Sequence, residues 1–152
     1  MAFPQPSSRI VLTTIFVVAA AVGVVFGLLV SSQTLMNNGS IVKTIGVSVY
    51  WDSECTNPTT AIDWGPLSPG EARDCTVYVK NDGTAAEVLS MQTGNWTPPE
   101  VSGWLSMSWN CTDHVVPHET VVAAVLTLTV APDASYTPSF EFDLTIIGTE
   151  VT

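Results

Sequence analysis

The strongest hydrophobic pattern in the chain is an uncharged run from Ile10 to Val30, in which only Thr13 and Thr14 have polar side chains. As a helix rising 1.5 Å per residue, the run is about 30 Å long, which matches the hydrocarbon core of a bilayer. We therefore predict a transmembrane helix over residues 10–30 that contacts membrane lipid. The alternative is a cleaved signal peptide, but the apolar part of such a peptide usually has only about 7–15 residues.

The residues that flank this run indicate its orientation. Arg9 and the amino terminus precede it, whereas the next basic residue, Lys43, lies more than ten positions after it. The positive-inside rule then keeps residues 1–9 in the cytoplasm and places the following residues outside the cell. We expect a single-pass protein of the cell membrane with a polar linker at residues 31–40 and an extracellular C-terminal domain.

Beyond residue 40 the pattern changes to short apolar segments with alternation, separated by turn residues. Strands are predicted at residues 41–51, 76–79, 86–93, 104–110, 121–130 and 140–147. Between the second and third of these, Asn81-Asp82-Gly83 is a hairpin signal, so we expect those two strands to pair. Short strands at this spacing predict a mainly β fold, an antiparallel sandwich over residues 41–152, with Trp51 and Trp109 packed in its core.

Charge divides the chain at the same place as hydropathy. The 152 residues have a mean hydropathy of +0.34 and a formal charge of −10. All 14 acidic residues follow residue 50, with only Arg73 and Lys80 as basic residues there, so residues 51–152 have a net charge of −12. A nucleic-acid partner is excluded, because phosphate binding needs clustered Lys and Arg.

Several segments of the predicted domain resemble a known group of proteins. These are VSVYWDSECTN, IDWGPLSPGE and the closing FEFDLTIIG, in the range 41–148. They resemble small single-span surface proteins of archaea whose external domain is an immunoglobulin-like β-sandwich. The resemblance implies the fold and the membrane topology, and it implies no activity.

Cysteines and glycosylation sequons fall only in the part of the chain predicted to be external. An external domain permits a disulfide, and Cys75–Cys111 is the preferred pair because both residues lie at or next to predicted strands. A bridge from Cys55 to either of them, and three free thiols, remain open alternatives. The acceptor sequons begin at Asn38, Asn95 and Asn110, which makes these residues candidate glycosylation sites.

Candidate metal ligands occur in two segments. Cys111, His114 and His118, next to Asp113 and Glu119, have the donor types that hold Cu or Zn. Oxygen donors for Ca²⁺ gather in the first half of the domain, at Asp52, Glu54, Asp63 and Asp74. Neither set has the spacing of an established motif, so we expect no cofactor, loop histidines without a ligand role and a solvated acidic face.

No catalytic constellation stands out, because the chain lacks glycine-rich phosphate loops, nucleophile elbows and zinc-protease motifs. We expect a non-enzymatic surface protein that acts in adhesion or protein–protein assembly. One alternative is a pilin-like filament subunit, in which the apolar segment packs in a fibre core or residues 41–50 are donated as a strand to a neighbour. The others are an accessory subunit of a membrane complex and a metal-binding or redox module. We expect protein partners, either through self-association or within a membrane complex.

Overall fold

The structure is a computed structural model that describes residues 39–135 and 139–152. The predicted cytoplasmic segment 1–9 and the transmembrane helix 10–30 lie outside these residues, as does almost all of the linker 31–40. Within the described ranges, no helix has the length and apolar character needed to cross a membrane.

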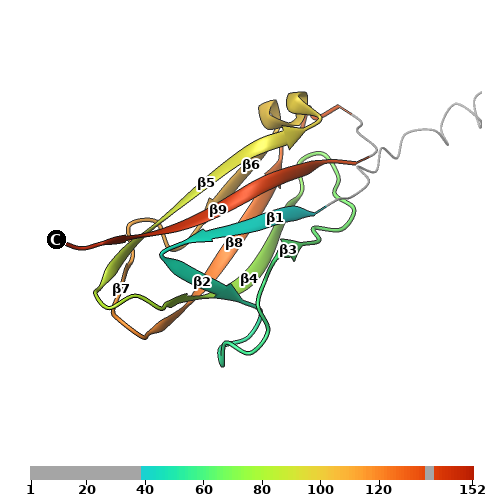
Figure 1. The fold of residues 1–152 in the computed structure, drawn as a ribbon. Coiled ribbons are helices and arrows are strands. Elements are labelled where there is room, and N and C mark those ends of the chain that lie inside the picture. Colours follow the sequence, from blue (N-terminus) through green and yellow to red (C-terminus); the bar gives the residue numbers. More distant parts are fainter. Residues whose placement is uncertain (1–38, 136–138) are drawn as a thin grey trace, which may run out of the picture. The chain divides into compact units, whose positions relative to one another are not determined.

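The described chain folds into two β-sheets, which Figure 1 shows as two layers. Its elements are β1 (Ser40–Ile45), β2 (Val47–Tyr50), β3 (Ala61–Ile62), β4 (Ala72–Asn81), β5 (Glu87–Thr97), the 3-10 helix η1 (Pro99–Gly103), β6 (Leu105–Trp109), β7 (Val115–Val116), β8 (Val121–Val130) and β9 (Glu141–Glu150). The five-stranded sheet has the order β3-β1-β9-β5-β7, and the four-stranded sheet has the order β2-β4-β8-β6. The predicted mainly β, sandwich-like architecture is confirmed.

The strand predicted over residues 41–51 is wrong as a single element, because it divides at Gly46. β1 pairs in parallel with β9, whereas β2 pairs antiparallel with β4 in the other sheet. Gly46 has a φ of +77°, and a Cβ there would lie 2.7 Å from the carbonyl oxygen of Gly148. Glycine adopts this left-handed conformation without steric cost, so the chain can leave one sheet and enter the other here.

The predicted hairpin between residues 76–79 and 86–93 is also wrong. β4 pairs with β2 and β8, whereas β5 pairs with β9 and β7, so the connection crosses from one sheet to the other. Asn81 holds this crossover. Its buried side chain donates to the carbonyls of Ala85 (2.8 Å) and Val116 (2.9 Å) and accepts from the amide of Gly83 (2.8 Å).

The core lies between the sheets and is formed by the alternating apolar positions of the long strands. Phe142, Leu144 and Ile146 of β9 are buried, as are Leu126 and Leu128 of β8. The predicted strand 121–130 is confirmed without change, and those at 104–110 and 140–147 are confirmed with shifts at their ends. Burial of this apolar surface is the main favourable contribution to folding.

The tryptophans only partly follow the prediction. Trp109 is partly buried against the core, but Trp51 is 37% exposed and follows β2 instead of packing inside. The largest fully buried side chain is that of Trp64, which is 1% exposed. Its indole N–H donates to the Ser40 hydroxyl (3.3 Å), which satisfies the polar atom that burial would otherwise leave unpaired.

Candidate functional site

The preferred disulfide Cys75–Cys111 is not formed, and all three cysteines are free thiols. β8 lies between β4, which carries Cys75, and β6, which Cys111 follows. Two strand spacings of about 4.8 Å separate the two backbones by roughly 10 Å, but a disulfide needs Cα atoms about 4.4–6.8 Å apart. Burial raises the pKa of both thiols above the ordinary value of 9.0.

The candidate copper or zinc ligands do not converge. Cys111 is buried, and its Sγ lies near the side chain of Asn110 and the carbonyl of Ala123. His118 is exposed, with Nδ1 against the carbonyl of Gly83 and Nε2 3.7 Å from a carboxylate oxygen of Glu119. In the described residues, no group of three or more His, Cys, Asp and Glu side chains is placed to hold a metal ion.

The acidic residues considered for calcium make separate local contacts. Asp63 accepts a hydrogen bond from the amide of Gly65 (2.9 Å), and Asp74 accepts one from the Thr127 hydroxyl on β8 (2.6 Å). Asp52 binds amides of its own loop, at Thr56 and Asn57. These contacts occupy the carboxylates with protein donors at different places in the fold.

Two of the three sequons lie in the described chain, and both acceptor residues are exposed. Asn95 is in β5 with a φ of +52°, and its side-chain amide bonds to the carboxylate of Asp143. Asn110 follows β6, and its side-chain oxygen accepts from the amide of Val125 (2.8 Å). Asn38 lies outside the described residues.

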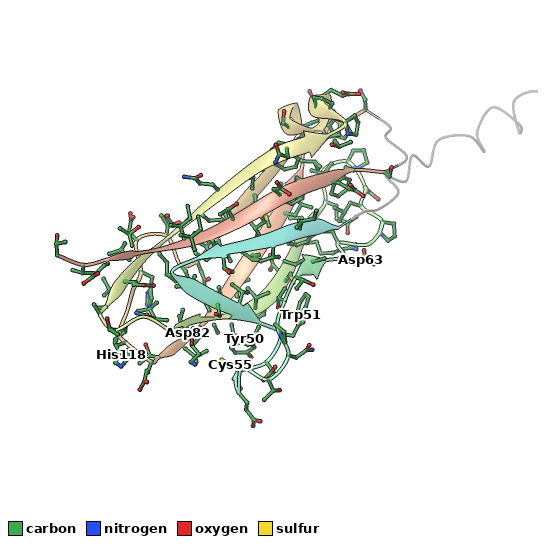
Figure 2. All side chains as sticks on the ribbon, viewed as in Figure 1. Tyr50, Trp51, Cys55, Asp63, Asp82 and His118 are labelled. Carbon is green, nitrogen blue, oxygen red and sulfur yellow. The ribbon has the colours of Figure 1, made fainter. Side chains whose placement is uncertain are left out.

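The most distinctive exposed feature is the connection from β2 to β3, residues 51–60, which we call the Trp51 loop. Figure 2 shows Tyr50, Trp51 and Cys55 together at this loop. It folds back along β2: the amide of Trp51 donates to the carbonyl of Asn57 (2.8 Å), and the amide of Thr59 donates to that of Val49 (2.8 Å).

One carboxylate holds the tip of the Trp51 loop. Asp52 accepts from the amides of Thr56 (3.0 Å) and Asn57 (2.7 Å) and from the Thr56 hydroxyl (3.3 Å). The Thr56 amide is the largest of the causes that keep the pKa of Asp52 below its ordinary value of 3.8. Cys55 adopts a φ of +56° inside this turn. The loop is thus closed by hydrogen bonds, and it presents Trp51 on an ordered backbone.

An ion pair lies beside the Trp51 loop. Lys80 of β4 lies opposite Ser48 of β2, and its Nζ is 2.7 Å from Oδ1 of Asp82. Their hydrogen bond raises the pKa of Lys80 and lowers that of Asp82. Burial raises the pKa of the neighbouring Cys55 thiol, which therefore stays protonated and weakly nucleophilic at neutral pH.

A second exposed feature lies where β6 begins. A hollow of about 310 Å³ is lined by residues 102–106, which lead from η1 into β6, and by residues 129–132 at the end of β8. Its lining combines the apolar Trp104, Leu105 and Val130 with the hydroxyl side chains Ser102, Ser106 and Thr129 and contains no charged side chain. Such an uncharged surface favours contact with another uncharged group.

The acidity of the domain is unevenly placed. Most acidic residues lie in loops or at strand ends, such as Asp52, Glu54, Asp113 and Asp133. The outer face of the five-stranded sheet is mixed, with Ile41 53% exposed and Ile45 58% exposed, and with Asp143 of β9 opposite Ile41. The sequence pattern signals acidity but not the face on which each acidic residue lies, because that face depends on the strand register.

Sequence reasoning missed Trp51 as an exposed residue by placing it at the end of a strand. The signal was present, because Trp51 directly precedes DSECTNP, a run of turn-forming residues that contains Asn57-Pro58. No protein-family model matches this chain, and a search of curated proteins finds no significant match.

Proposed function

We propose that this chain is a membrane-anchored cell-surface protein whose external β-sandwich has a non-enzymatic role in adhesion or protein–protein assembly. The observation that carries the proposal is Trp51, a tryptophan 37% exposed on a loop that Asp52 closes by hydrogen bonds. Tryptophan on an ordered surface is typical of interaction hot spots, because it contributes a large contact area at little entropic cost.

The membrane part of the proposal is supported by the sequence. The run at 10–30 has no charge, Arg9 precedes it, and residues 51–152 have a net charge of −12. A domain of this charge is repelled by anionic headgroups and stands away from the surface that anchors it. Protease added to intact cells should therefore remove the domain, whereas complete protection would contradict the topology.

The immunoglobulin-like assignment is the finer part of the fold proposal. It is supported by the exchange of the first strand between sheets at Gly46 and by the crossing connections β4–β5 and β8–β9. Such crossings are typical of Greek-key sandwiches, in which neighbours in sequence lie in opposite sheets. The resemblance to small archaeal surface proteins points the same way.

The interaction role is tested by a photo-reactive amino acid at position 51 of the full chain, expressed in its own cells. We expect cross-linking to one defined partner after irradiation. The matched control carries the same group at Gly94 of β5, in the other sheet, where an added Cβ would have no neighbour within 4 Å. Equal cross-linking from both positions, or none from position 51, would contradict a binding role for the Trp51 loop.

A further inference from the structure

β6 is an edge strand that the described part of the chain leaves open. It pairs with β8 along Leu105–Trp109, and no described strand pairs with its other side. An open edge presents unpaired N–H and C=O groups that can pair with another chain. Edges of this kind are normally blocked by charge, proline, bulges or covering loops.

The other edges in the described residues are partly protected, although β1 beyond Ile41 and β5 beyond Val88 have no described strand partner on their outer sides. The Trp51 loop covers β2, with Pro58 bridged to Tyr50 and the Thr59 amide bonded to Val49. β3 and β7 have two residues each. Where β5 extends beyond β7, its register is interrupted between Gly94 and Thr97.

The register of β6 against β8 shows which backbone groups face outward. The amide of Ala131 donates to the carbonyl of Trp104 (2.8 Å), and the amide of Asn110 donates to that of Val125 (3.3 Å). In an antiparallel ladder, residues in step with these pairs point their polar groups at β8, and the alternate residues point theirs away. Leu105, Met107 and Trp109 therefore direct N–H and C=O toward the open side.

Charge distinguishes this edge from the rest of the domain. Residues 101–112 include no Asp, Glu, Lys or Arg, although residues 51–152 have a net charge of −12. Two copies of so acidic a domain repel each other over most of their surface, but they can approach along an uncharged edge. A basic partner would gain nothing from this neutral strand. The edge therefore favours a second copy over a partner that is recognised by charge.

We propose that β6 pairs antiparallel with β6 of a second copy across a two-fold axis at Met107. Leu105 then lies opposite the partner's Trp109, and the three outward-facing residues of each strand form six backbone hydrogen bonds in total. The half-buried Met107 and Trp109 become covered, and the two four-stranded sheets become continuous. This proposal rests on the proposed function, because a membrane anchor concentrates copies in one plane.

The register makes a specific cross-linking prediction. Ser106 lies opposite the partner's Ser108 in a non-hydrogen-bonded pair, in which Cα atoms are about 4.5 Å apart. In full-length protein with Cys55→Ser, the double variant S106C/S108C should form disulfide-linked dimers under mild oxidation in detergent. The matched control T145C/I147C has the same spacing on β9, which is paired on both sides. If only the control forms cross-links, the copies meet at the outer face of the five-stranded sheet, and the proposal is overturned.

Charge placed on the edge should separate the copies. Ser106 and Ser108 are exposed, so S106K/S108K leaves the core intact while it places four like charges around the two-fold axis. We expect the dimer dissociation constant, measured by sedimentation of the full chain in detergent, to rise at least about tenfold from like-charge repulsion. S90K/Q92K on the other sheet is the matched control, and an equal effect from both pairs would overturn the proposal.

The two proposals fail separately. A monomeric full-length protein, with no S106C/S108C cross-link, overturns the β6 pairing but leaves a partner captured at position 51 unaffected. If the dimer persists in the S106K/S108K variant, and also in reducing agent, which excludes a disulfide-linked dimer, then the copies associate through another surface. That result also overturns the β6 pairing. A dimer that depends on β6, in a protein whose domain is protected from external protease, would support the pairing and contradict the surface location.

Discussion

At the scale of single residues, glycines make room for a buried carboxylate. Glu87 is buried, and its Oε2 has no hydrogen-bond partner. Three glycines from different segments surround it: a Cβ would lie 3.3 Å from a Glu87 carboxylate oxygen at Gly46, 2.9 Å at Gly83 and 2.1 Å at Gly148. Because these residues have no side chain, their Cα–H groups can approach the Glu87 carboxylate and make weak C–H···O contacts with it.

Gly148→Ala should destabilise the fold. Its new Cβ would meet Glu87 Oε2 at 2.1 Å and Val47 Cγ1 at 2.7 Å, and overpacking of this kind costs about 1–3 kcal/mol. Thermal unfolding followed by tryptophan fluorescence measures the loss. Gly94→Ala is the matched control, because a Cβ there has no neighbour within 4 Å. Equal losses from both variants would show that the contact with Glu87 is not the cause.

Asp52→Ala should loosen the Trp51 loop without unfolding the domain, because the carboxylate accepts the Thr56 and Asn57 amides. Hydrogen exchange of the peptide 52–59 should show lost protection, whereas Glu54→Ala should not, since that side chain is exposed.

Low pH should cause the same loss of hydrogen-exchange protection in the Trp51 loop of the unmodified chain. The folded-state pKa of Asp52 lies below its ordinary value of 3.8, so its contribution is complete above that value and is lost as the pH falls through the folded pKa. After correction for intrinsic exchange rates, loop protection should be constant from pH 7 to about pH 5 and fall below about pH 4. Protection that falls near pH 6 would point to a different group.

At the scale of elements, crossovers between sheets decide which strands become neighbours. Asn81 bonds two carbonyls and one amide, and so it directs β4 into a crossover where the sequence signals a hairpin. The same arrangement places β8 between Cys75 and Cys111 and prevents their disulfide. The absence of the predicted hairpin and the absence of the predicted disulfide have the same cause. Strand neighbours depend on long-range packing, whereas turn residues specify only the local bend.

Asn81→Ala should cost about 2–3 kcal/mol of unfolding free energy, since it leaves buried backbone groups without partners. Asn57→Ala is the matched control, because its side chain is exposed. Denaturant unfolding of the full chain in detergent measures both variants, and a loss below about 0.5 kcal/mol for Asn81→Ala would contradict its role in the crossover.

Thiol labelling tests the strand order. Cys55, in the Trp51 loop, and Cys75 are both partly exposed, so they should react in the native protein, although slowly because burial raises the pKa of each thiol. The buried Cys111 should react only after denaturation. All three thiols should titrate in denaturant without reductant, and two missing thiols would reveal a disulfide.

At the scale of the whole molecule, the domain is strongly acidic but has an uncharged edge at β6. Like-charge repulsion between two domains acts over distances comparable with the Debye length, which falls from about 10 Å at 0.1 M salt to about 3 Å at 1 M. The proposed β6 dimer should therefore tighten several-fold over this range in sedimentation experiments. A dimer that weakens instead is held by ion pairs, and the uncharged β6 edge would then not be the contact.

Sequence periodicity determined where most strands lie. The long strands at 121–130 and 140–147 were predictable because alternation along a strand reflects one buried face, a local property that needs no knowledge of neighbours. Composition likewise determined the acidity of the domain and the apolar run at 10–30.

Tertiary structure alone decided how these strands are assembled. The break at Gly46, the crossover at Asn81, the separation of Cys75 from Cys111 and the open edge of β6 depend on contacts between residues far apart in sequence. Trp64 and Trp51 make the same point: the buried tryptophan follows a two-residue strand, and the exposed one follows a regular strand. Local pattern reports the preference of each segment, whereas its final place is fixed by the partners that cover it.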